Sequence, residues 1–144
     1  MAEKKSTRWK YYQPNKKDLK DEYGDCVIRA LCKVTGKEWL EVFDELTPYV
    51  REVQANPNAP QVYSKYLKDN GFKWVGIKAE KGSKRPTVQS FAKDHKEGTY
   101  ILRVSHHIVA VSDGSFWDTW DSGYKSVYGY YVKEETLSNQ IHCQ

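Results

Sequence analysis

The chain has 144 residues and a net charge of +4, a length that fits one domain with its own hydrophobic core. No apolar run approaches the roughly 20 residues that a transmembrane helix needs, and no hydrophobic stretch follows the basic N-terminus, so neither a membrane span nor a secretory signal is expected. The three cysteines, two of them in one predicted helix, favour a reducing, cytoplasmic setting.

The positive charge is concentrated near the N-terminus. Residues 1–20 hold seven Lys or Arg against two acidic residues, a net charge of +5, while the rest of the chain sums to −1. A basic segment of this kind is expected to be mostly extended and solvated. We therefore expect residues 1–20 to form a leader, 21–135 a single domain and 136–144 a polar tail.

Three early segments carry apolar residues at helical spacing, which predicts helices over 24–36, 37–46 and 61–71. Gly36 stands where a C-terminal cap belongs. The Asn- and Pro-containing segment 51–61 is predicted to be a loop.

The second half of the chain alternates apolar and polar residues in several places. The pattern predicts the following elements in order: a strand over 72–78, a loop over 79–86, a helix over 87–98, two strands over 99–123 and a last strand over 126–135. Thr87 is the predicted N-cap of the helix and Gly98 its stop. Helices that precede most of a sheet indicate an α+β fold, with N-terminal helices packed on a C-terminal antiparallel sheet.

The dipeptide Asp113-Gly114 predicts a tight hairpin turn that pairs Ser112 with Ser115. Because side chains alternate across a strand, this register predicts a shared, packed face. The residues on that face are His107, Val109, Val111, Phe116, Asp118 and Trp120.

The same register separates two neighbouring histidines. His107 becomes a diagonal neighbour of Asp118 on the packed face, whereas His106 points to the other face, opposite Asp121. A His–Asp pair in a packed environment is how a catalytic base is oriented. The alternative is a purely structural His–Asp hydrogen bond at a sheet edge.

Cys26 is the candidate nucleophile for such a base. It lies in the first turn of the 24–36 helix, at the rim of the buried stripe, where free backbone N–H groups and the helix dipole favour a thiolate. Asp25 is a candidate N-cap. Cys32 is expected to lie nearly opposite the core. The alternative for Cys26 is a small buried hydrophobic residue.

The segment "GDCVIRAL", followed far downstream by "HIVAVSDGSFWDTWDS", resembles the papain-like cysteine peptidase superfamily. It is most similar to small single-domain papain-like proteins of bacteria and their phages, akin to the bacteriocin-processing peptidases. The resemblance covers residues 22–131. It implies a papain-like fold without a cofactor or metal, a peptide or protein substrate, and the roles of nucleophile for Cys26, base for His107 and orienting acid for Asp118.

The sequence departs from that family before the cysteine. Papain-like enzymes place a Gln there to help form the oxyanion hole, but residues 18–23, "DLKDEY", contain none. Gln13 and Asn15 are the nearest amide side chains and are the candidate donors. Arg29 resembles a recurrent feature of the small group: it would pair with Asp25 or bind a substrate carboxylate, against the default of a solvated surface Arg.

Four functional hypotheses follow. The first is a thiol hydrolase that cleaves peptide or isopeptide bonds through a thioester, although the same triad would serve an acyltransferase. The second is a catalytically weak or inactive binding or inhibitor module, phage-encoded and host-directed. The third, nucleic-acid binding, is supported only by the basic, aromatic leader. A zinc site is the weakest, because adjacent histidines on a strand point apart. Loops 51–61 and 79–86 are candidate rims of a substrate site.

Overall fold

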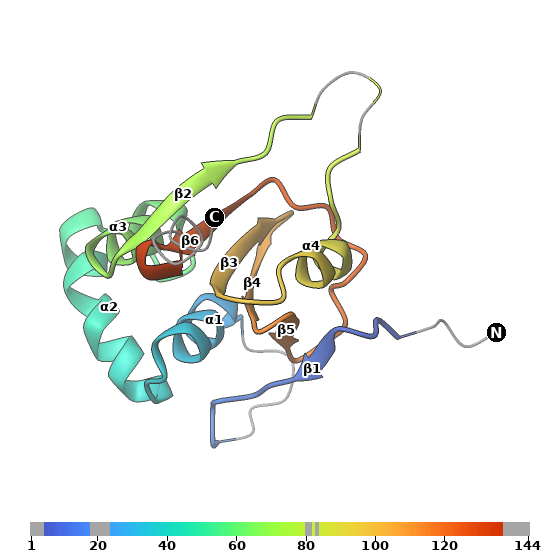
Figure 1. Cartoon of the computed structure of the whole chain (residues 1–144). Coiled ribbons are helices and arrows are strands. Elements are labelled where there is room, and N and C mark those ends of the chain that lie inside the picture. Colours follow the sequence, from blue (N-terminus) through green and yellow to red (C-terminus); the bar gives the residue numbers. More distant parts are fainter. Residues whose placement is uncertain (1–4, 18–23, 80–81, 83, 137–144) are drawn as a thin grey trace.

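A six-stranded mixed sheet forms the centre of the protein, and helices cover both of its faces (Figure 1). The computed structural model describes residues 5–17, 24–79, 82 and 84–136. The strands are β1 (Trp9–Tyr11), β2 (Phe72–Gly76), β3 (Thr99–Val104), β4 (His107–Ser112), β5 (Ser115–Asp118) and β6 (Gly129–Lys133), in the sheet order β1-β5-β4-β3-β6-β2. The helices are α1 (Cys26–Thr35), α2 (Trp39–Val53), α3 (Pro60–Asp69) and α4 (Val88–Asp94).

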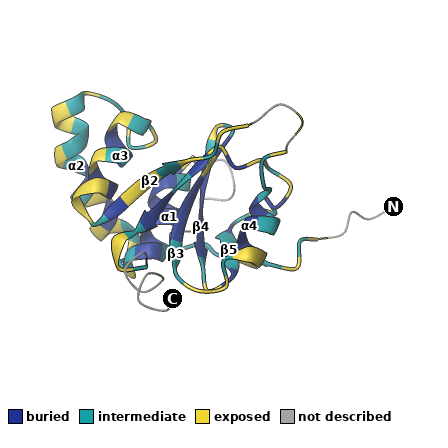
Figure 2. Cartoon of the chain, turned by 45° about the horizontal axis from the view of Figure 1, so that its top comes forward, coloured by how far each residue is buried: buried dark blue, intermediate teal, exposed yellow. Residues whose placement is uncertain are grey.

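Alternation along the central strands produces two separate cores (Figure 2). Ile108 and Ala110 of β4 pack with α1, α2 and α3, whereas Val109 and Val111 pack with α4 on the opposite face. A strand that is buried on both sides must be apolar at every position, which explains the run Ile-Val-Ala-Val. The predicted α+β class is confirmed, but the helices lie on both faces of the sheet.

The helices depart from the prediction mainly at their ends. The first ends at Gly36 with φ 73°, as the glycine predicted. The second continues through Pro48 to Val53 and so includes residues predicted to be loop, because Val50 and Val53 still pack against the core. Helix α4 begins at the Thr87 cap as predicted but ends at Asp94, well before Gly98.

The basic N-terminal segment contributes a strand that the sequence did not predict. Trp9 pairs with Phe116 and Tyr11 with Asp118, so β1 runs parallel to β5 at the edge of the sheet. The segment is extended, as expected, but residues 9–11 are not solvated main chain, because their backbone joins the ladder. The sheet is therefore mixed and not wholly antiparallel.

The hairpin between β4 and β5 has the predicted register, with Ser112 opposite Ser115 and Val111 opposite Phe116. Asp113 and Gly114 both have positive φ, at 53° and 77°, as a two-residue hairpin turn requires. The strand expected to run unbroken into this turn is in fact two, β3 and β4, joined at Ser105-His106, where His106 has φ 55°. Histidine is among the residues that adopt this left-handed conformation more readily than most.

The last predicted strand is confirmed in its core, β6, and is shorter than the range 126–135. The predicted tail beyond residue 136 lies outside the described residues. Among the described residues, no helix has the length and apolar composition needed to cross a membrane.

Candidate active site

Three elements bring the predicted site residues together at one end of the sheet. Cys26 is the first residue of α1, His107 the first of β4 and Asp118 the last of β5. Because β4 and β5 are antiparallel, the start of one strand and the end of the other lie side by side. Positions that are 81 and 11 residues apart in sequence thus become one cluster.

The histidine and the aspartate are directly hydrogen-bonded, as the hairpin register predicted. Nε2 of His107 lies 2.6 Å from Oδ2 of Asp118. Trp120, which was expected in the core, is instead 36% exposed, and its ring centroid lies 4.9 Å from that of the His107 imidazole. It therefore lies against the imidazole at the protein surface.

Cys26 is only partly buried, at the rim of the helix as expected. Burial raises the pKa of its thiol. Three interactions lower the pKa by a larger amount: the hydrogen bond with His107, the charge of that imidazole and a hydrogen bond with the Ile108 backbone. The net pKa therefore lies below the ordinary value. Since Nε2 of His107 is held by Asp118, Nδ1 is the ring nitrogen that remains for the thiol.

The imidazole of His107 is the matching acid of this pair. Burial alone would lower its pKa, but the hydrogen bond that it donates to Asp118, together with the contact to Cys26, raises the pKa to about 9. A lowered cysteine pKa beside a raised histidine pKa favours the thiolate–imidazolium form of the pair over the neutral form.

Cys32 does not lie opposite the core, and that prediction is wrong. Its side chain is 1% exposed, within the cluster that α1 forms with the sheet and α2. The helix is covered on more than one side, so its second face is also buried. Burial raises the pKa of the Cys32 thiol to about 12, and the charge of Asp25 adds to the rise.

A buried ion network supports the triad from α1. Arg29 is 8% exposed and bridges two carboxylates, Asp25 through Nη1 and Asp118 through Nη2 at 3.3 Å. The default of a solvated arginine is therefore wrong, and the pairing with Asp25 is confirmed. Asp25 occupies the N-cap position but makes no capping hydrogen bond with its side chain, because its oxygens bind Arg29 and Nε1 of Trp39.

Asp118 is held on every side by donors that the sequence did not reveal. The N–H of Thr119 donates to Oδ1 at 2.8 Å, and the hydroxyl of the fully buried Ser122 donates to Oδ2 at 3.1 Å. A carboxylate with this many partners is fixed in position and satisfied although buried. Ser122 lies between β5 and β6, outside any helix or strand, so no periodic pattern could have identified it.

Neither of the two amide side chains proposed as oxyanion donors lines the cavity beside Cys26. Oε1 of Gln13 accepts the N–H of Asn15 at 3.0 Å, and Oδ1 of Asn15 accepts the N–H of Lys17. Asn15 lines a separate cavity of about 510 Å³ beside Trp39. The window 18–23, where papain-like enzymes carry a Gln, lies outside the described residues.

His106 does not face Asp121 as predicted, because neither residue belongs to the β4–β5 ladder. His106 lies in the turn before β4, and Asp121 accepts the N–H groups of Ser6 and Gly123 at 2.7 and 2.9 Å. His106 is exposed and lines the cavity beside the cysteine.

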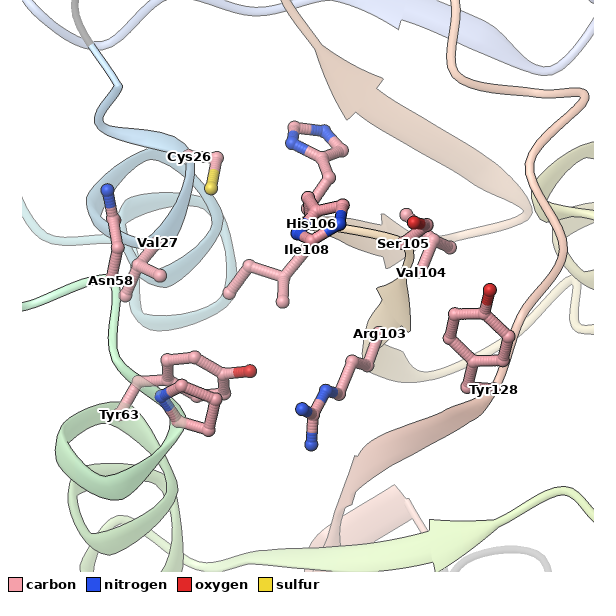
Figure 3. Close-up of a pocket in the computed structure, with 12 residues that line it drawn as sticks. Cys26, Val27, Asn58, Tyr63, Arg103, Val104, Ser105, His106, Ile108 and Tyr128 are labelled. Atoms are coloured by element: carbon pink, nitrogen blue, oxygen red, sulfur yellow. The ribbon is translucent and has the colours of Figure 1, made fainter.

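A cavity of about 470 Å³ opens next to Cys26 and His107 (Figure 3). Asn58, from the loop predicted over 51–61, and Pro60, the first residue of α3, form part of its lining, so this segment borders the cavity. Asn58 Nδ2 donates to the carbonyl of Gly24, the residue two before the cysteine. The other predicted rim, the loop 79–86, contributes no residue to the described lining.

Comparison with known proteins found no matching family model, no similar curated protein and no similar solved structure. Among the residues that the structure describes, no three His, Cys, Asp or Glu side chains cluster in a way that would hold a metal ion.

Proposed function

We propose that the protein is a thiol hydrolase of the papain-like kind that cleaves peptide or isopeptide bonds through a thioester intermediate. The observation that carries the proposal is the chain of contacts from Cys26 through His107 to Asp118 beside an open cavity. A nucleophile, a base and an orienting group in this order are the minimum set for acyl transfer.

In the proposed first step, the Cys26 thiolate attacks the carbonyl carbon of the scissile amide. The C–N bond then breaks, and the His107 imidazolium gives its proton to the departing amine, which leaves a thioester on Sγ. Asp118 holds Nε2 of His107, so Nδ1 is the atom that delivers the proton.

In the second step, neutral His107 takes a proton from water through the same nitrogen, and the hydroxide attacks the thioester. The C–S bond breaks, the acid product leaves, and the thiolate–imidazolium pair is restored. If an amine attacked the thioester in place of water, the reaction would be an acyl transfer, and His107 would take the proton from the amine.

The start of α1 is the proposed source of oxyanion stabilisation. The first N–H groups of a helix have no partner within it, and the side chain of Asp25, at the N-cap, makes no capping hydrogen bond. The N–H of Cys26 is therefore available to a developing oxyanion, with the helix dipole favouring negative charge there.

The direct test is incubation of the full chain with a peptide mixture from a digested proteome, followed by mass spectrometry. We expect new peptide termini with the native protein, none with Cys26→Ala or His107→Ala, and a Cys26 acyl adduct when the reaction is quenched with acid. Absence of both new termini and adduct would overturn the hydrolase proposal.

One observation favours a second candidate, a binding module on a catalytically weak scaffold. Neither Gln13 nor Asn15 lines the cavity beside Cys26, so neither amide stands beside the helix N–H groups as a second oxyanion donor. A module of this kind would retain its cellular effect in the Cys26→Ala variant, whereas a hydrolase would lose it.

A further inference from the structure

We propose that Arg103 determines the specificity of the cavity beside Cys26 by binding a carboxylate of the substrate. This inference rests on the proposed function, because it names the chemistry of the chain that the cysteine attacks. The guanidinium of Arg103 points into the cavity that Cys26 borders, from the opposite wall (Figure 3).

The position of Arg103 breaks the apolar pattern of its strand. Ile101, two residues earlier in β3, and Ile108, its partner in β4, both belong to the core formed with α1, α2 and α3. Strand periodicity places Arg103 on that same face. A cation at an inward position of an otherwise apolar face is a local exception of the kind found at functional sites.

Arg103 has no counter-ion within the part of the chain that the structure describes. None of the ion pairs there involves it, and no Asp or Glu lines the cavity. The side chain is exposed. A guanidinium presents a rigid fork of donors that matches a carboxylate in two parallel hydrogen bonds.

Tyr63 connects this cation with the nucleophile. Burial raises the pKa of its hydroxyl most, while the charge of Arg103 lowers the pKa and that of the Cys26 thiolate raises it, so both charges act on the same phenol. Tyr63 lines the same cavity as Cys26 and Arg103.

A second cation lies behind one wall of the cavity. Tyr128 lines the cavity, and the guanidinium carbon of Arg85, which is not itself part of the lining, lies 5.0 Å from the centroid of the Tyr128 ring. The described lining contains no Asp or Glu, and it includes several aromatic and aliphatic side chains. This arrangement fits an apolar segment that carries one negative group.

Two sources can supply that group, an acidic side chain or the C-terminal carboxylate of a peptide. They are separated with short peptide electrophiles that alkylate Cys26. Bromoacetyl peptides extend from the cysteine in one chain direction and peptidyl chloromethyl ketones in the other; in each, the thiolate displaces the halide as the C–S bond forms. Each probe is made with Glu or with Gln at successive positions, and the bromoacetyl set is made as C-terminal amide and as free acid.

We expect one Glu probe, or one free acid, to label Cys26 at least roughly 10-fold faster than its neutral counterpart, the factor that corresponds to about 1.4 kcal/mol. Arg103→Gln should abolish that ratio and Arg103→Lys should retain part of it. The control is Arg51→Gln, which removes another exposed arginine, on α2, away from the cavity.

Each labelling rate is divided by the rate of the same variant with iodoacetamide, which is small and uncharged. Failure of Cys26 to react with iodoacetamide above the rate of an ordinary thiol would count against the proposed function. Normal iodoacetamide reactivity with equal Glu and Gln rates in the native protein, or with a preference unchanged in Arg103→Gln, would overturn the role of Arg103 alone.

Discussion

Arg29 and Asp118 meet at 3.3 Å although 89 positions separate them in the sequence. Through this contact α1, which carries Cys26, forms an ion pair with the carboxylate that is hydrogen-bonded to His107. The distance between nucleophile and base thus depends on a buried ion pair as well as on the packing of α1 against β4.

Removal of the Arg29 charge should lower the free energy of unfolding substantially. Arg29→Met leaves Asp25 and Asp118 as buried carboxylates without their cation, and loss of one member of a buried network costs about 3–5 kcal/mol in free energy of unfolding. Urea denaturation measures the change. The control Arg51→Met, an exposed residue, should change the same quantity by less than about 0.5 kcal/mol. A loss below about 1 kcal/mol for Arg29→Met would show that the network is not needed for stability.

The two described cysteines should differ strongly in reactivity. The interactions with His107 lower the pKa of Cys26, whereas burial raises the pKa of Cys32 to about 12. Cys32 is also inaccessible to solvent. Because each pKa unit changes the thiolate fraction tenfold, iodoacetamide should label Cys26 at least roughly 100-fold faster. Peptide mapping after brief labelling measures the ratio.

The same preference should depend on the imidazole. His107→Ala removes the hydrogen bond and the charge that lower the pKa of Cys26, so its labelling rate at pH 7 should fall toward that of an ordinary thiol. Cys32→Ala is the matched control and should leave the Cys26 rate unchanged. Equal, slow labelling of both cysteines in the native protein would contradict the activated thiolate.

Hydrolysis should have a pH optimum bounded by the two members of the pair. The pKa of Cys26 is lowered, so its thiolate is present above that pKa and is lost as the pH falls through it. The pKa of His107 is raised to about 9, so its imidazolium is present below about pH 9 and is lost as the pH rises through it.

Asp118→Asn tests this assignment, because the amide cannot stabilise the imidazolium as a carboxylate does. The alkaline limb of the hydrolysis profile should move to lower pH, by one unit or more, and the rate at pH 8 should fall. Thr119→Ala keeps the N–H that donates to Asp118 and should leave the limb in place. An alkaline limb that does not move in Asp118→Asn would exclude Asp118 as the cause of the raised pKa.

A side chain at Gly114 should destabilise the hairpin that sets the His107–Asp118 register. This residue has φ 77°, and a Cβ there would lie 3.2 Å from the Cα of Lys96. Gly114→Ala should therefore cost the strain of a left-handed alanine, about 1–2 kcal/mol, and a further steric term. Gly36→Ala is the matched control, since Gly36 has φ 73° with no atom within 4 Å of the added Cβ. If Gly114→Ala and Gly36→Ala lose the same stability in thermal or urea unfolding, the contact with Lys96 has no steric cost.

The sequence predicted those parts of the site that depend on local rules. The turn Asp113-Gly114 dictates the register, and that register alone places His107 beside Asp118. The position of Cys26 at the start of a helix likewise follows from the apolar spacing and from Gly36. These features are short-range, so a single sequence contains the information.

The features that were missed are long-range. Residues 9–11 form too short a segment to show a strand pattern, and β1 exists only because β5 offers an open edge. Arg29 and Cys32 were expected near solvent because one stripe of a helix describes only one buried face. Other elements pack against a second face of α1, and the apolar periodicity of the helix sequence does not predict this tertiary packing.

The pairing of β1 with β5 links the beginning of the chain to Asp118, with the N–H of Tyr12 donating to the Asp118 carbonyl at 3.0 Å. Cys26 is synthesised before the β4–β5 hairpin that carries His107 and Asp118. The hydrogen bond and charge that lower the pKa of its thiol come from His107, so they act on Cys26 only after this hairpin has paired and packed against α1. The reactivity of the thiol therefore reports on closure of the sheet.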